Sequence, residues 1–157
     1  MAFPAFAQIQ DVQITVVKKK LDEAKKGNGP VTITAKEVAY TVTVQNRRFA
    51  EMAEVQVKYM IFLADEQGGS REKAVTVSHN GSETIKNLAS NATVSFETKP
   101  FILAKEELAG NYYYASGASS RAQDKVSGVW IRAFANGKQI GEYANPPSVT
   151  KKYDWKE

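Results

Sequence analysis

The sequence contains no cysteine and only one histidine, His79, among its 157 residues. Without thiols the chain cannot form disulfides, thiolate metal sites or a cysteine nucleophile, and such a composition fits the cytosol or a bacterial envelope equally well. The histidine stands beside Asn80-Gly81, a pair typical of a tight hairpin turn. We therefore interpret it as a solvated turn residue, since a catalytic imidazole needs an orienting partner and a positioned nucleophile.

Other catalytic and ligand-binding motifs are also missing. No Gly-rich phosphate loop and no strand-to-helix nucleophile elbow occurs. Asp65, Glu66 and Asp124 could offer oxygen ligands to calcium, but they lack the alternating acidic spacing of a dedicated site. Glu106 and Glu107 are adjacent and would point apart on a strand, which makes them poor paired glycosidase carboxylates. We predict a protein that is not an enzyme, with no catalytic, cofactor-binding or metal-binding residue.

Long hydrophobic runs are absent too, so the sequence predicts no transmembrane span, which needs roughly 20 apolar residues. The formal charge of +4 comes from short basic clusters such as residues 18–20 and Arg47-Arg48, which acidic residues interrupt. Such clusters are typical of solvated strand ends and loops, so we expect no nucleic-acid partner.

What the sequence does contain is a period-two alternation of apolar and polar residues along most of its length. This pattern buries one face of each extended segment and leaves the other in water. Seven to nine short strands, separated by turn signals, predict an all-β fold, an antiparallel β-sandwich with one or two short helical turns.

Several local features of that sandwich can be predicted. We expect a loop over residues 20–30, with a helical turn at 21–26, and a second helical turn at 104–109. Asn80-Gly81 and Asn136-Gly137 each predict a tight hairpin. The apolar positions change parity across residues 35–37, which predicts a bulge or a break in that strand.

Three segments carry a resemblance to a known family. Residues 40–46 followed by 55–59 resemble the B strand, loop and C strand of bacterial and archaeal immunoglobulin-like domains related to cell adhesion. Residues 85–96 resemble a later loop and strand of these domains, and Asn136-Gly137 resembles their F–G turn. The resemblance implies an immunoglobulin-like sandwich. The chain is also weakly similar to surface proteins that accompany type IV pilus-like systems in gut bacteria.

This sequence departs from the immunoglobulin pattern in three respects. No cysteine pair joins the B and F strands, Tyr59 stands where the C strand has a tryptophan, and Trp130 lies on the expected F strand. We expect Trp130 in the core. The connection before that strand is also longer than usual.

The domain organisation is simple. Residues 1–8 read either as a signal-peptide remnant, because Ala5-Phe6-Ala7 has the small-x-small pattern of a cleavage site, or as an added start. Residues 9–147 form a single immunoglobulin-like domain, and residues 148–157 form a polar tail. If residues 1–8 are a signal-peptide remnant, the protein is exported, and we expect it in the periplasm, associated with the outer membrane or on the cell surface.

The aromatic residues are the most specific functional lead. Tyr112, Tyr113 and Tyr114 alternate in direction if the run is extended, so at least one ring faces solvent or an interface. Trp155, in the charged tail, is either disordered or docks on a neighbouring subunit. We therefore expect a structural or interaction protein whose partner is an envelope protein, a host surface protein or a second copy. The alternative is a carbohydrate-binding module that stacks sugars on residues 112–114.

Overall fold

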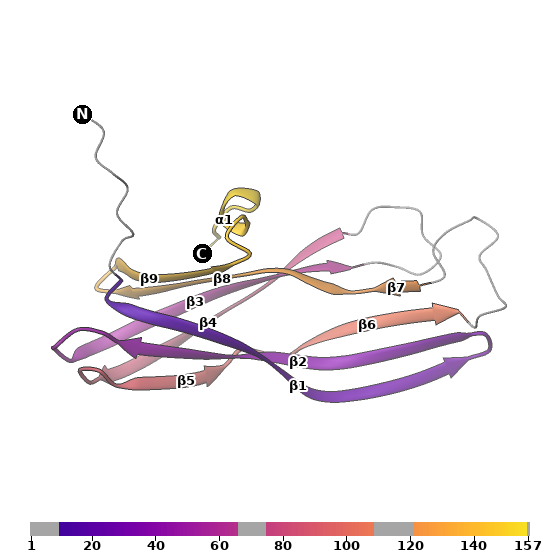
Figure 1. The fold of residues 1–157 in the computed structure, drawn as a ribbon, viewed down its shortest axis with the longest axis horizontal. Coiled ribbons are helices and arrows are strands. Elements are labelled where there is room, and N and C mark those ends of the chain that lie inside the picture. Colours follow the sequence, from indigo (N-terminus) through magenta and orange to yellow (C-terminus); the bar gives the residue numbers. More distant parts are fainter. Residues whose placement is uncertain (1–9, 66–74, 109–120, 157) are drawn as a thin grey trace.

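A computed structural model describes residues 10–65, 75–108 and 121–156 (Figure 1). The strands and the one helix of these ranges are β1 (Val12–Asn28), β2 (Val31–Asn46), β3 (Met52–Asp65), β4 (Val75–Leu88), β5 (Thr93–Glu97), β6 (Phe101–Leu108), β7 (Arg121–Gln123), β8 (Lys125–Ala135), β9 (Lys138–Asn145) and α1 (Val149–Lys152). The described part of the chain is therefore all-β apart from one short helical turn, as predicted.

The strands form two antiparallel sheets. The first has the order β1-β2-β6-β7, with β5 also paired to β2, and the second has the order β4-β3-β8-β9. Strands β3, β8 and β9 are neighbours as strands C, F and G are in an immunoglobulin-like sandwich, and β1 and β2 take the places of A and B. The predicted antiparallel sandwich is confirmed.

The core lies between the sheets and is built by the period-two pattern. Alternate residues of β2 and β3 point inward, and from Val38 to Val44 on β2 and from Val55 to Ile61 on β3 the inward side chains are aliphatic or aromatic. Trp130 is buried as predicted, but it lies on the outer face of the second sheet, in a separate cluster. The central cluster includes Val12, Val38, Val42, Val44, Val55, Val57, Ile61 and Ile131.

The predicted loop over residues 20–30 and its helical turn are wrong. Strands β1 and β2 form one long hairpin, paired from Val12↔Asn46 to Asn28↔Val31. Only Gly29 and Pro30 form the turn, and Gly29 supplies the positive φ of 63° that a two-residue hairpin turn needs. The antiparallel pairing of this hairpin provides hydrogen-bond partners for the backbone N–H and C=O groups of residues 20–28. The polar side chains of these residues do not by themselves predict a strand.

The predicted bulge at residues 35–37 is also wrong, because β2 pairs with β6 without a register shift there. The irregularity lies instead in β1, between Lys20 and Asp22. In a regular strand, a change of parity means that apolar side chains move to the opposite face. Ile33 thus lies on the outer face of the first sheet, whereas Val38 and Val42 point into the core.

The two Asn-Gly pairs behave differently. Asn136-Gly137 forms the predicted β8–β9 turn, with φ values of 54° and 75°. Asn80-Gly81 does not turn but continues within β4, paired with Met60 and Tyr59 of β3. His79 is therefore a strand residue and not a turn residue, and its Nε2 lies 3.2 Å from the carbonyl oxygen of Lys99.

The second predicted helical turn, at residues 104–109, is wrong over the part that the structure describes. Residues 104–108 belong to β6, where Ala104 pairs with Ala35 and Leu108 pairs with Val31. Pairing with the long β2 strand overrides the helix-favouring composition of this segment.

Candidate binding surfaces

A cleft of about 560 Å³ opens between the two sheets, where β1, β2 and β6 diverge from β8 in Figure 1. Lys18 and Tyr40 are directly paired, as are Lys36 and Leu103, and paired residues share one face of a sheet. These side chains therefore line the same wall. Val126, Val129 and Tyr143 line the opposite wall.

The two sheets meet at one side of this cleft through Asp124. This residue separates β7, which pairs with β6, from β8, which pairs with β3. Its N–H donates to the carbonyl oxygen of Ala104 (2.8 Å), and its Oδ2 accepts the Ala104 N–H (2.9 Å). One predicted calcium-ligand candidate thus bonds to backbone, and no group of three or more metal-ligating side chains occurs among the described residues.

Charged side chains line the rim of the cleft. Lysines come from four strands: Lys18, Lys36, Lys105 and Lys125. Lys105 forms an ion pair with Glu107, at 2.7 Å. Burial raises the pKa of the Tyr40 phenol, and the neighbouring Tyr143 adds to the effect, so this hydroxyl stays a hydrogen-bond donor well into the alkaline range.

A second candidate surface is the loop between β2 and β3. Phe49 is 96% exposed there, with Arg47 and Arg48 immediately before it. The Arg47 N–H donates to the Asp11 carbonyl (2.9 Å), and Ser90 Oγ donates to the Arg48 carbonyl (2.7 Å). The loop backbone is thus tied to two other segments, while its aromatic ring contacts solvent.

Asn46 is the residue that holds this loop. Its side chain is fully buried, and its Oδ1 accepts the Arg48 N–H at 2.9 Å. Its Nδ2 donates to three carbonyl oxygens, those of Ala50 (2.9 Å), Leu88 (3.0 Å) and Ala89 (3.1 Å). One amide therefore satisfies buried backbone groups on both the β2–β3 loop and the end of β4.

A third surface is the outer face of the first sheet. Val17, Ile33 and Ile102 lie on this face and are 61%, 40% and 54% exposed. Ile33 is there because of the parity change in β2 described above, whereas Val17 and Ile102 are outward residues of β1 and β6. Single exposed aliphatic residues are common, but three on one sheet face form a surface that a partner could cover.

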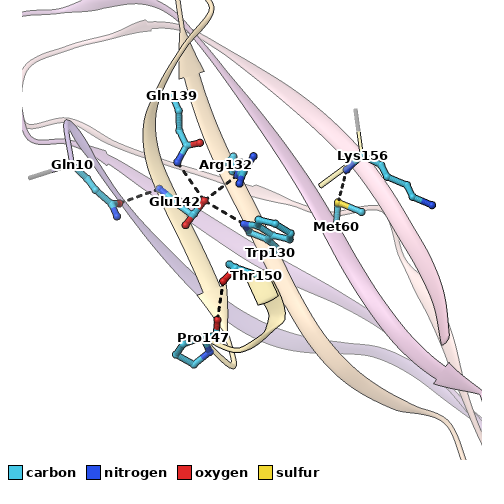
Figure 2. Close-up of polar contacts among 9 residues, drawn as sticks. All are labelled: Gln10, Met60, Trp130, Arg132, Gln139, Glu142, Pro147, Thr150 and Lys156. Atoms are coloured by element: carbon cyan, nitrogen blue, oxygen red, sulfur yellow. Dashed lines mark hydrogen bonds and ion pairs between the residues drawn. The ribbon is translucent and has the colours of Figure 1, made fainter. Parts of the chain in front are cut away.

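The outer face of the second sheet is covered by the end of the chain itself. Tyr153 stacks on Phe62, with ring centroids 3.9 Å apart and planes 8° apart. Trp155 contacts Trp130 edge to face at 5.2 Å. Residues 148–156, expected as a polar tail, thus pack on the sandwich, and Lys156 donates its N–H to Met60 Sδ at 3.4 Å (Figure 2).

A single arginine joins the two tryptophans. The guanidinium of Arg132 lies 4.6 Å from the Trp130 ring centre and 4.7 Å from that of Trp155. Glu142 Oε2 accepts the Arg132 Nε–H at 2.9 Å and also lies 3.4 Å from Trp130 Nε1 (Figure 2). This arrangement combines cation–π contacts with a half-buried ion pair.

The sequence-predicted site residues have different outcomes. Tyr112, Tyr113 and Tyr114 lie outside the described residues. Trp155 was expected to be disordered or to dock on another subunit, and it instead packs on Trp130 of its own chain. Phe49 lies in the loop expected between residues 40–46 and 55–59 and was missed as a site residue, although an aromatic residue in a polar loop was a usable signal.

The fold and these surfaces define an antiparallel β-sandwich with an inter-sheet cleft. No helix in the described ranges is long and apolar enough to cross a membrane. No protein-family model matches the chain, and no curated protein matches it.

Three solved structures show distant similarity. The structural-genomics target SoR45 is 9% identical, with 85% of each chain covered and a TM-score of 0.39. A Bordetella pertussis protein assigned as ApaA is 12% identical over 86% of this chain and 92% of its own, with a TM-score of 0.41. A protein from Akkermansia muciniphila is 11% identical over 93% of this chain and 77% of its own, with a TM-score of 0.39. Similarity at this level says nothing about what the chain binds.

Proposed function

We propose that this protein is a non-enzymatic, exported or surface-associated interaction protein that acts in adhesion or in pilus-like assembly. The observation that carries the proposal is Phe49, an aromatic ring 96% exposed on a loop whose backbone is fixed by Asn46 and Ser90. Exposing a phenylalanine to water is unfavourable by roughly 1.5–3 kcal/mol relative to burying it. A partner that covers the ring recovers this free energy without first ordering the loop.

The neighbours of Phe49 support the same function. Interfaces are enriched in aromatic residues and arginine, and a few such residues supply most of the binding free energy. Arg47 and Arg48 immediately precede the ring on the chain. The Arg48 guanidinium lies 4.0 Å from the Asp11 carboxylate and is exposed, so it can also reach a partner's acidic group. The partner proposed here is a protein of the envelope, a host surface protein or a second copy of this chain.

Photo-crosslinking from position 49 tests the proposal. Phe49 is replaced by a photoreactive phenylalanine analogue in the native host, and the same analogue is placed at the exposed Lys86 on β4 as a matched control. We expect one defined crosslinked species from position 49 and none from position 86. Identical products from both positions, or no product from position 49, would contradict the proposal.

Export is tested separately, by fractionating the native host and determining the first residue of the mature chain. Cleavage after Ala7 is expected from the Ala5-Phe6-Ala7 pattern. Recovery of an uncleaved chain in the cytoplasm would contradict the exported location while leaving the crosslinking result intact.

A further inference from the structure

We infer that the cleft between the sheets binds a small amphiphilic anion, a molecule with a carboxylate or phosphate head and a short apolar chain or ring. The cleft combines an apolar floor with a basic rim, and it shares no lining residue with the Phe49 loop. Its volume of about 560 Å³ lies within the range of roughly 300–1,000 Å³ typical of small-molecule sites.

The charge of the lining selects an anion. Four lysines and one carboxylate line the cleft, and Glu107 pairs with Lys105, so the local formal charge is +4 − 2 = +2. The carboxylate, that of Asp124, already accepts the Ala104 N–H. Lys18 pairs with Tyr40 and Lys36 pairs with Leu103, so both lysines lie on the inward face of the first sheet, and neither forms an ion pair with a described residue. Two ammonium groups on one wall of the cleft can therefore bind one anionic head.

The floor selects an apolar body. Leu103 and Val129 belong to the buried core and also line the cleft, so the cleft reaches down to the hydrophobic interior. Both side chains are aliphatic, so an aliphatic chain can lie against them without breaking a hydrogen bond or an ion pair. Tyr40 and Tyr143 add ring surface, and neither hydroxyl donates to another described residue, which leaves two donors for the head group or its water.

The geometry explains why the lysines point inward at all. Lys36 and Thr34 occupy inward positions of β2 beyond the parity change, where the alternation would otherwise place core residues. Lys105 is paired with Thr34 and lies on the same face. A sandwich closed along its whole length would bury these ammonium groups at a high cost, so the open cleft and the basic lining belong together.

Isothermal titration calorimetry with decanoate as the probe tests the inference. Decyl phosphate distinguishes a phosphate head from a carboxylate head, and decyltrimethylammonium reverses the charge at the same chain length. We expect one-to-one binding of decanoate or decyl phosphate, with the cation at least about tenfold weaker, which corresponds to ~1.4 kcal/mol. Equal binding of all three would overturn the inference, since it would mean only an apolar site. Absence of binding by either anion would overturn it as well.

A matched pair of variants locates the site. The Lys18→Glu, Lys36→Glu double variant changes two charges that line the cleft, and Lys86→Glu, Lys138→Glu makes the same change at exposed positions outside the cleft. Binding should fall about tenfold or more in the first and by less than about twofold in the second. Equal losses would point to net charge rather than the cleft. The thermal unfolding midpoint of each variant shows whether lost binding is due to lost folding. Tyr143→Phe keeps the ring and removes only the hydroxyl, so it tests the hydroxyl as a donor to the head group.

Discussion

The Tyr59 ring lies directly over the backbone of Gly81, its partner across the β3–β4 pair. A Cβ atom added to Gly81 would overlap the Tyr59 phenol. The Tyr59 hydroxyl accepts the N–H of Lys99 at 2.9 Å, so the ring also fixes the segment that follows β5. Gly81 is therefore required for close approach and not for a turn, which explains why Asn80-Gly81 stays within a strand.

Gly81→Ala should destabilise the fold by about 1–3 kcal/mol, because the phenol must move and lose its contact with Lys99. The matched control is Gly27→Ala on β1, where nothing lies within 4 Å of the added methyl group. Urea unfolding should show a lower midpoint for the first variant only. Equal midpoints would mean that Tyr59 can move aside without cost.

Asn46→Ala should cost about 2–4 kcal/mol, since it leaves several buried backbone groups without a partner. The same variant should speed amide exchange around Phe49 by freeing the loop. Denaturant unfolding and hydrogen exchange measure the two effects. A stability loss without faster exchange near Phe49 would show that Asn46 does not order the loop.

Asn46→Asp tests the same site through pH. A buried carboxylate facing carbonyl oxygens has a raised pKa, because both burial and the carbonyl dipoles disfavour its charged form. A raised pKa in the folded state gives stability that is present at low pH and lost as pH rises. This variant should therefore be more stable at acid than at neutral pH, relative to wild type. A pH-independent difference would contradict the geometry.

Trp155→Ala should detach the end of the chain from the second sheet. The loss of ring contacts with Trp130 and Arg132 is worth about 1–3 kcal/mol. Hydrogen exchange should become faster in α1, while the centre of β8 stays protected. Asp154→Ala, at an exposed neighbouring position, is the control. Unchanged exchange in α1 would show that Phe62 and Tyr153 hold the segment by themselves.

Lys20→Ala should raise the pKa of Glu23 toward its ordinary value. The Glu23 carboxyl has a lowered pKa, first because Lys20 Nζ lies 3.1 Å from its Oε2, and further because Lys36 and Lys25 are near. A depressed pKa gives a contribution to stability that is present above the ordinary value of 4.5 and lost as pH falls. Carboxyl NMR titration of both proteins measures the shift, and an unchanged titration would refute the ion pair.

The sequence by itself determined the fold class. The alternation along β3 and the second half of β2 marks one apolar face to bury, and Asn136-Gly137 favours the tight turn that it forms. These are local properties of the chain, so they could be read without knowing what lies across from each strand. The same holds for Trp130, whose size favours burial.

The tertiary structure alone decided the surfaces. Pairing with β2 made strands of residues 20–28 and 104–108, whose composition favours other states. The Tyr59 ring kept Asn80-Gly81 extended. Lys18, Lys36 and Lys105 are far apart in sequence and share one wall of the cleft because β1, β2 and β6 pair in one sheet. The loop that exposes Phe49 is held by Asn46. Each outcome depends on a distant partner, whose contribution exceeds local propensity and cannot be read from a single segment.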